Sequence, residues 1–205
     1  MTESFMDLPV DLDLYSDRLD GLNDSYQTHV AALLHGELMT FLPDGLYAQI
    51  EANMPIACVD FVPVERAEGR ISRVGLILRE SPHGRVWCHL GGRVRRGETL
   101  RAALERHSLE TIGLELDVSV NPQPDAVFEW FPSSIAPADG TVFGDDPRKH
   151  AIGLAYVLGM PFEGASPRGE ALDFASFDPT NLPADLWPGC RELFTRLGIT
   201  ERAGN

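Results

Sequence analysis

One stretch, residues 91–114, constrains the fold of this chain more than any other, because it reads as a glycine turn that runs into a capped helix. An apolar, aromatic-containing run at residues 86–90 precedes two glycines, so a strand is expected to end where the backbone must approach another group closely. Apolar and small residues then recur at helical spacing over residues 100–112. Thr99 is placed to cap the start of this helix, and Gly113 to end it in the left-handed conformation. The sequence therefore predicts a strand, a turn and a helix in that order.

Two charged residues, Glu98 and Arg106, flank the first half of this helix. A planar guanidinium can form a two-pronged contact with a carboxylate, so this pair is expected to tie the loop to the helix that follows it. Both residues are therefore assigned a structural role.

The same stretch resembles a Nudix box, the signature of hydrolases that act on nucleoside diphosphates linked to another group. The residues that match the box are Gly92, Glu98, Arg106, Glu110, Gly113 and Leu114. The box is degenerate, because His107 and Thr111 stand where the family has metal-binding glutamates, and Ser108 replaces an apolar residue. The phrases around Gly91, Glu98 and Leu104 are most similar to the GDP-mannose mannosyl hydrolase branch, which also lacks one of the box glutamates.

The resemblance extends beyond the box, over roughly residues 41–197. It implies the Nudix fold, an α/β/α sandwich with a mixed β-sheet, over residues 41–200. Residues 1–40 would then be an N-terminal extension and residues 201–205 a tail.

The resemblance also implies a divalent metal. Residues 107, 110 and 111 share one face of the helix, where family members hold magnesium against the diphosphate. One carboxylate alone is a weak magnesium site, so we expect Mg²⁺, or Mn²⁺, to be held by Glu110, the backbone carbonyl of Gly92 and the phosphates of the substrate. His107 is either a ligand for a softer metal or, the favoured interpretation, a polar residue left on a decayed metal face.

A later segment resembles the part of the family that holds an extra metal ligand and a general-base histidine. Glu170 falls at the ligand position and is therefore a candidate ligand. Ala171 stands where the histidine is expected, so the usual base is missing.

Two arginines are candidates for binding the diphosphate, because their positions coincide with family arginines: Arg79 and Arg93. His150 matches a family histidine at the start of a strand and could act as an acid or base. The candidate catalytic residues are Arg93, Glu110 and His150. The neighbouring arginines, Arg95, Arg96 and Arg101, are expected to be solvated.

Composition restricts the partners. The formal net charge is −14, from 31 acidic and 17 basic residues, which argues against a general nucleic-acid or anionic-membrane surface. Three widely spaced cysteines, Cys58, Cys88 and Cys190, lie in apolar runs and are expected to be buried thiols of a reducing compartment. Without a basic region before an apolar run at the start, the chain is expected to be cytoplasmic.

The remaining pattern predicts further elements. Helices are expected at residues 26–39, 43–54 and 183–197, and strands at 56–64, 74–79, 116–120, 126–131 and 151–158. A polar turn at residues 65–73 should join the first two strands, and the irregular segment 132–149 is either a lid or an incidental excursion. Asp60 lies inside an apolar strand and should have a partner, in a structural role or in contact with the substrate.

These observations leave three hypotheses. The first is a metal-dependent hydrolase of a nucleoside diphosphate derivative, with a nucleoside diphosphate sugar as its substrate. The second is a catalytically silent sensor or binding module for such a nucleotide-type ligand. The third, a purely structural dimer module, is least favoured because it leaves the arginines without a role. The expected partner is a small molecule and neither nucleic acid nor membrane, and two copies could form a homodimer.

Overall fold

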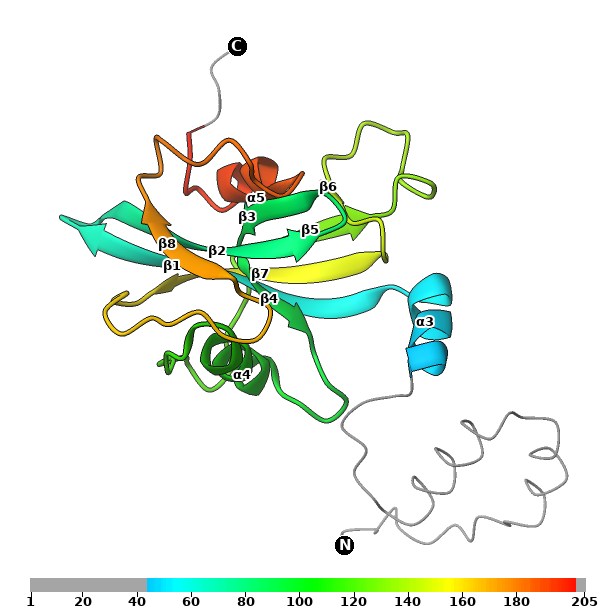
Figure 1. Ribbon diagram of the computed structural model, residues 1–205, viewed down its shortest axis with the longest axis horizontal. Coiled ribbons are helices and arrows are strands. Elements are labelled where there is room, and N and C mark those ends of the chain that lie inside the picture. Colours follow the sequence, from blue (N-terminus) through cyan, green and yellow to red (C-terminus); the bar gives the residue numbers. More distant parts are fainter. Residues whose placement is uncertain (1–43, 202–205) are drawn as a thin grey trace, which may run out of the picture. The chain divides into compact units, whose positions relative to one another are not determined.

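The computed structural model describes residues 44–201, and within them a mixed β-sheet lies between helices α4 (Leu100–Ile112) and α5 (Cys190–Arg196) (Figure 1). This arrangement confirms the predicted α/β/α sandwich. Helix α3 (Asp44–Asn53), also predicted, is the first of the described elements. The boundary between the two units of the chain falls inside α3, between Ile50 and Glu51, and the described strands, α4 and α5 all belong to the second unit.

The sheet has eight described strands in the order β3-β2-β1-β7-β5-β6, with β4 paired to β1 and β8 paired to β2. Two of the described pairings, β1 with β7 and β5 with β6, are parallel, and the others are antiparallel. The strands are β1 (Ile56–Ala67), β2 (Arg70–Ser81), β3 (Gly84–Cys88), β4 (Leu90–Arg93), β5 (Ala126–Phe131), β6 (Gly144–Asp145), β7 (Ala151–Gly159) and β8 (Asp173–Phe177).

Strand β1 is the centre of the sheet. It pairs with β7 from Ile56 to Val64, while its other edge pairs first with β4 and then with β2. A strand enclosed in this way is buried along most of its length, which explains why its sequence is a nearly continuous apolar run.

The hairpin between β1 and β2 is tighter than the predicted turn at residues 65–73. Both strands continue through that polar stretch to Glu68 and Gly69, whose φ angles are 51° and 77°. Two consecutive positive φ angles are typical of the two-residue turn that matches the twist of a hairpin. Polar residues here mark the exposed end of a strand pair and not a loop.

The strand that precedes the box also differs from the prediction. It breaks at His89 and resumes as β4, which includes both glycines instead of ending at them. Gly91 pairs with Asp60, and a Cβ at Gly91 would overlap the carbonyl oxygen of Val59. Gly91 therefore allows β4 to lie close to β1 within the sheet.

Two further predictions are wrong in part. Residues 116–120 form no strand: Val118 is buried, but none of the described strands pairs with the segment. The closing helix begins at Cys190 and not at residue 183, because Pro188 and the left-handed Gly189 (φ 100°) interrupt the pattern before it.

Helix α4 begins and ends at the residues that the sequence predicts. The Thr99 side chain accepts a hydrogen bond from the Ala102 N–H at 3.1 Å, and Gly113 is left-handed with φ 71°. Ser108, which replaces an apolar residue of the box, is fully buried and donates its hydroxyl to the carbonyl of Leu114 at 2.7 Å.

Backbone from a distant loop completes the C-terminal end of α4. The N–H groups of Ser166 and Arg168 donate to the carbonyls of Ile112 and Thr111, each at 2.8 Å. A helix leaves its last carbonyls without intrahelical partners, so these bonds fix the loop of residues 163–172 to the helix end.

The three cysteines are free and buried, as predicted. Burial raises the pKa of Cys58 and of Cys88 to about 12, so both remain thiols at neutral pH.

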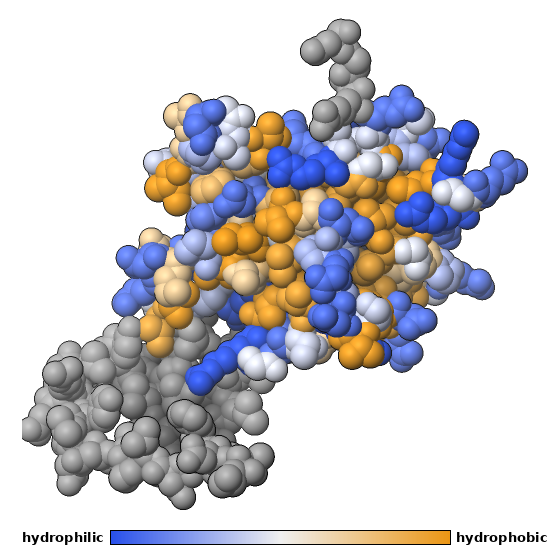
Figure 2. All heavy atoms as spheres, turned by 180° about the vertical axis from the view of Figure 1, so that it is seen from behind, coloured by the Kyte–Doolittle hydropathy of each residue, from blue (hydrophilic) through white to orange (hydrophobic). Residues whose placement is uncertain are grey.

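On the face shown in Figure 2, hydrophobic residues are interspersed with hydrophilic ones. Among the described helices, none has the length and apolar character needed to cross a membrane. The predictions for residues 1–43 and 202–205 lie outside the described residues.

Candidate functional site

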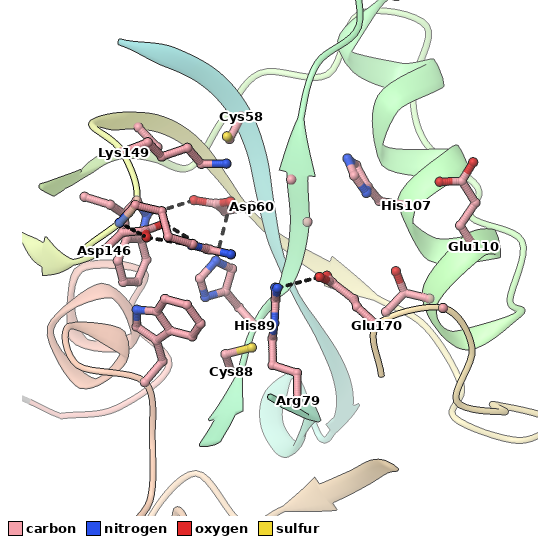
Figure 3. A pocket seen from close by; sticks show the side chains of 18 residues that line it. Cys58, Asp60, Arg79, Cys88, His89, His107, Glu110, Asp146, Lys149 and Glu170 are labelled. Atoms are coloured by element: carbon pink, nitrogen blue, oxygen red, sulfur yellow. Dashed lines mark hydrogen bonds and ion pairs between the residues drawn. The ribbon is translucent and has the colours of Figure 1, made fainter. Parts of the chain in front are cut away.

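A cavity of about 330 Å³ opens beside α4 and over the strands that carry the glycines (Figure 3). This volume is at the lower end of the range found for small-molecule sites. In Figure 3, His107 and Glu110 of α4 lie on one side of the cavity, and Asp60, Asp146 and Lys149 lie on the other. The site therefore has a side formed by the box helix and an opposite side formed by the sheet and its loops.

The tie between Glu98 and Arg106 is confirmed. Arg106 Nε lies 2.6 Å from Glu98 Oε1, and Nη2 donates to Oε2 at 2.9 Å and to the Arg93 carbonyl at 3.1 Å. The hydrogen bond from Arg106 lowers the pKa of Glu98 and raises the pKa of Arg106 itself. This shielded pair holds the box loop against α4.

On the helix side, the positions that the resemblance assigns to metal ligands carry His107, Glu110 and Thr111, and all three line the cavity. Burial lowers the pKa of His107, so its ring is neutral at pH 7, and its Nε2 lies 3.2 Å from the Arg93 carbonyl. The half-exposed Glu110 carboxylate lies 3.4 Å from Arg95 Nη2 and 3.3 Å from Arg106 Nη1. The carboxylate of this face is therefore partly neutralised by two guanidinium groups.

Between the two sides, Arg79 of β2 and Glu170 form an ion pair with Nη2 and Oε2 2.6 Å apart. Arg79 Nε is buried and has no hydrogen-bond partner among the described residues. The guanidinium carbon lies 5.6 Å from the ring centroid of Trp187. Arg79 thus faces the cavity with donor capacity that the protein does not use.

The opposite side contains a second arginine–carboxylate pair. Arg148 donates Nε and Nη2 to the two oxygens of Asp146 at 2.8 and 2.9 Å. Burial alone would raise the pKa of Asp146, but the hydrogen bonds and charge of Arg148 outweigh it and the pKa is lowered. Lys149 lies nearby, with its Nζ 3.7 Å from Glu51.

Asp60 has the partners that its place in an apolar strand requires. Trp130 Nε1 donates to Oδ2 at 3.1 Å, and His89 Nε2 lies 3.4 Å from Oδ1. The ring of His89 stacks on Trp130, with centroids 5.1 Å apart, and its other nitrogen lies 3.5 Å from Cys190 Sγ. This chain of contacts resembles a catalytic triad in its connectivity, but Cys190 is fully buried and its thiol pKa is raised by burial, so it is no nucleophile.

The side chains present do not form a ready-made metal site. Glu110 and Glu170 each contact arginines, and His107 and Thr111 are poor magnesium ligands. Among the described residues, no group of three or more His, Cys, Asp or Glu side chains is arranged to hold an ion. A divalent ion would therefore need most of its ligands from bound phosphate and water.

The cavity gathers some of the predicted site residues and leaves others outside. Its lining includes Arg79, Gly92, Glu110 and Glu170. It does not include the two remaining candidates, Arg93 and His150. His150 instead stacks on Phe131, with centroids 4.1 Å apart, and its Nε2 lies 3.4 Å from Glu129. The roles proposed for Arg93 and His150 stay predictions.

Sequence reasoning gave no site role to several residues that line the cavity: His89, Trp130, Asp146, Arg148, Lys149 and Trp187. The basic pair at residues 148–149, in a chain with a net charge of −14, was the available signal. The two tryptophans gave none, since an isolated tryptophan is usual in a core.

The chain belongs to the family described as Domain of unknown function (DUF4916), whose model matches residues 39–187. It is also similar to a solved structure from Jonesia denitrificans, described as a possible asymmetric diadenosine tetraphosphate (Ap4A) hydrolase. The identity is 30%, the match covers 75% of this chain and 99% of the other, and the TM-score is 0.62. No curated protein sequence matches the chain.

Two more distant structures have the same fold. A MutT Nudix hydrolase from Burkholderia pseudomallei is 19% identical over 72% of this chain and 98% of its own, with a TM-score of 0.51. A bifunctional NMN adenylyltransferase/ADP-ribose pyrophosphatase from Francisella tularensis, in complex with AMP and a manganese ion, is 14% identical over 90% of this chain and 51% of its own, with a TM-score of 0.53. The protein therefore has the Nudix fold, as its box predicts.

Proposed function

We propose that this protein is a Nudix-type hydrolase of a nucleoside diphosphate linked to another group, with a nucleoside diphosphate sugar as its substrate class. The observation that carries the proposal is one cavity lined both by the box glutamate, Glu110, and by three cations from two parts of the chain: Arg79 of β2 and the adjacent Arg148 and Lys149. A diphosphate carries several negative charges, and fixed cations in a partly enclosed site offset them most effectively. The similarity to a possible diadenosine tetraphosphate hydrolase supports the same class of chemistry.

In this proposal Arg79 and Arg148 contact the diphosphate by exchanging their carboxylate partners for phosphate oxygens. Glu110 and Glu170, with the carbonyl of Gly92, would contact a divalent ion, Mg²⁺ or Mn²⁺, that arrives with the phosphates and supplies charge neutralisation for the leaving group. The catalytic roles predicted for Arg93 and His150 remain part of the proposal, although neither residue lines the cavity.

The test is to incubate the protein with a panel of nucleoside diphosphate sugars, diadenosine tetraphosphate and ADP-ribose, with Mg²⁺ or Mn²⁺, in ¹⁸O-labelled water. We expect hydrolysis of at least one compound. Label in the phosphate would show attack at phosphorus, and label in the sugar would show attack at carbon, as the resemblance to the GDP-mannose mannosyl hydrolase branch implies. Binding without turnover across the panel would contradict the hydrolase.

A second function, a silent nucleotide sensor, is favoured by one observation: Glu110 is already partly neutralised by Arg95 and Arg106. Ala171, which the resemblance places where a base is expected, agrees with it. Glu110→Gln separates the two functions. In an enzyme it should abolish metal-dependent turnover with the fold intact, whereas in a sensor it should leave nucleotide binding equal or tighter, because it removes a negative charge beside the phosphates.

A further inference from the structure

The charged residues that line the cavity are paired, with one exception. Of the four described carboxylates in the lining, Glu110, Glu170 and Asp146 each lie within 4 Å of an arginine. Asp60 has neither an arginine nor a lysine partner among the described residues, and its contact with His89 is an ion pair only when the imidazole is protonated. Asp60 is also more than nine-tenths buried. The cavity wall thus contains one buried carboxylate without a permanent counter-charge.

The fold makes specific room for this carboxylate. A Cβ at Gly153, on the neighbouring strand β7, would overlap Asp60 Oδ2. A Cβ at Gly144 would overlap the ring of Trp130, whose indole N–H donates to the same oxygen. Two glycines therefore clear the space for Asp60 and for its tryptophan partner.

The contacts of Asp60 leave acceptor capacity unused. A carboxylate has about four acceptor positions, and one hydrogen bond, from Trp130, reaches Asp60 within the described chain. His89 is the second contact, at the longer distance of 3.4 Å. A buried acceptor of this kind is complementary to an N–H donor. A ligand that lacks the donor should bind more weakly, because it leaves the buried acceptor unmatched.

The cavity is aromatic beside Asp60, where His89 and Trp130 contact the carboxylate, and Trp187 lines the same cavity next to Arg148. Flat aromatic surfaces beside a hydrogen-bond acceptor are suited to a flat heterocycle, and Asp carboxylates accept hydrogen bonds from exocyclic amino groups of bases. We propose that Asp60 determines specificity by accepting a hydrogen bond from an exocyclic amino group of the ligand's nucleobase. This inference rests on the proposed function, because it places the diphosphate at Arg79.

The test compares ligands by calorimetry without divalent ions, so that nothing is turned over. Pyrophosphate reports the phosphate contacts alone, because it has no N–H donor. Guanosine and adenosine diphosphates carry an exocyclic amino group, and inosine diphosphate carries none. For the wild type, we expect guanosine or adenosine diphosphate to bind about tenfold more tightly than inosine diphosphate, as a matched donor predicts.

Asp60→Asn places an amide of the same shape at the acceptor. We expect it to reduce this preference to less than about twofold and to leave pyrophosphate affinity within about twofold. Asp173→Asn, which removes an exposed carboxylate outside the cavity lining, is the control and should change neither quantity. If Asp60 had only a structural role, the Asp60→Asn variant would melt at a lower temperature and bind all the ligands more weakly to the same degree.

Equal wild-type binding of the three nucleotides, a preference for inosine diphosphate, or an unchanged preference in Asp60→Asn would each overturn the proposal. The wild-type comparison needs no variant, so a variant that fails to fold does not remove the test. If pyrophosphate and the three nucleotides all fail to bind, the proposed function fails together with this inference. If they bind without discrimination, the inference alone fails.

Discussion

Two arginine–carboxylate pairs whose arginines lie on helix α4 differ mainly in their shielding from solvent. In the Glu98–Arg106 pair the side chains are 12% and 14% exposed, whereas in the Arg101–Glu105 pair they are 40% and 37% exposed. Solvent screens an exposed pair and each side chain loses rotamer freedom, so such pairs contribute little. Removing one partner of a shielded pair leaves the other partner buried and unmatched.

Arg106→Ala should therefore lower the free energy of unfolding by on the order of 1 to 3 kcal/mol. Arg101→Ala, on the same helix, should change it far less, because solvent screens the exposed pair. Chemical denaturation of both variants measures the difference. An unchanged midpoint for Arg106→Ala, combined with lost nucleotide binding, would show instead that Arg106 contacts the phosphate.

The same pair predicts a pH dependence. The pKa of Glu98 in the folded protein is below its ordinary value of 4.5, so the unfolded chain binds a proton more readily than the folded one. The stabilisation is complete above pH 4.5 and is lost as the pH falls through the lowered pKa of the folded state. Denaturation from pH 7 to pH 3 should show the wild type converging on Arg106→Ala, and a constant difference would contradict this.

At this scale the sequence predicted what lies within one motif. The spacing of Glu98 and Arg106 indicated their contact, because a helix fixes which neighbours meet. For Asp60 it predicted only that a partner must exist. The partner, Trp130, is 70 residues away and reaches Asp60 through the order of the strands, which no local pattern encodes.

Among the elements, helix α4 was predicted most closely, because its caps use residues with few alternatives. Strand ends were predicted less well. Polar residues at 65–73 and the glycines at 91–92 are typical of turns, yet apart from the two-residue turn at 68–69 both stretches are strand, since pairing partners rather than composition decide where a strand ends.

Two glycines near α4 separate backbone strain from crowding. Gly113 and Gly97 have φ angles of 71° and 78°, but a Cβ at Gly113 would lie 2.6 Å from the Arg168 guanidinium, whereas nothing lies within 4 Å of one at Gly97. Gly97→Ala should lower stability by about 1 kcal/mol from the backbone alone. Gly113→Ala should lower it by more, and thermal unfolding of both tests this. Equal losses would mean that Arg168 simply moves aside.

For the molecule as a whole, the cavity depends on strand order. Its lining comes from six strands, α4, the loops of residues 146–149 and 169–170, and the connecting residues His89 and Trp187, and the box supplies a minority of it. The resemblance in the box predicted the fold and the helix side of the site. The opposite side, with Asp146 and Trp187, lies where the resemblance is thin, so only the structure identifies it.

The ion pair between Arg79 and Glu170 predicts that cation and anion binding are linked. Phosphate bound at Arg79 releases Glu170 for a cation, so Mg²⁺ alone should bind weakly. A constant concentration of free Mg²⁺ should raise the affinity of the protein for pyrophosphate by about fivefold or more. Glu170→Gln should bind metal-free pyrophosphate more tightly than the wild type and gain less from Mg²⁺. Calorimetry tests both, with Asp173→Asn as the control. Tight binding of Mg²⁺ alone would contradict the linkage.

The backbone bonds from Ser166 and Arg168 to the end of α4 have a consequence for motion. These two amide hydrogens cannot exchange with solvent until the bonds to the Ile112 and Thr111 carbonyls open. Opening the loop and fraying the last turn of the helix are then a single cooperative event. Glu110 lies on the helix and Glu170 on the loop that these bonds join. The distance between the two carboxylates should therefore stay constant until the loop and the helix end open.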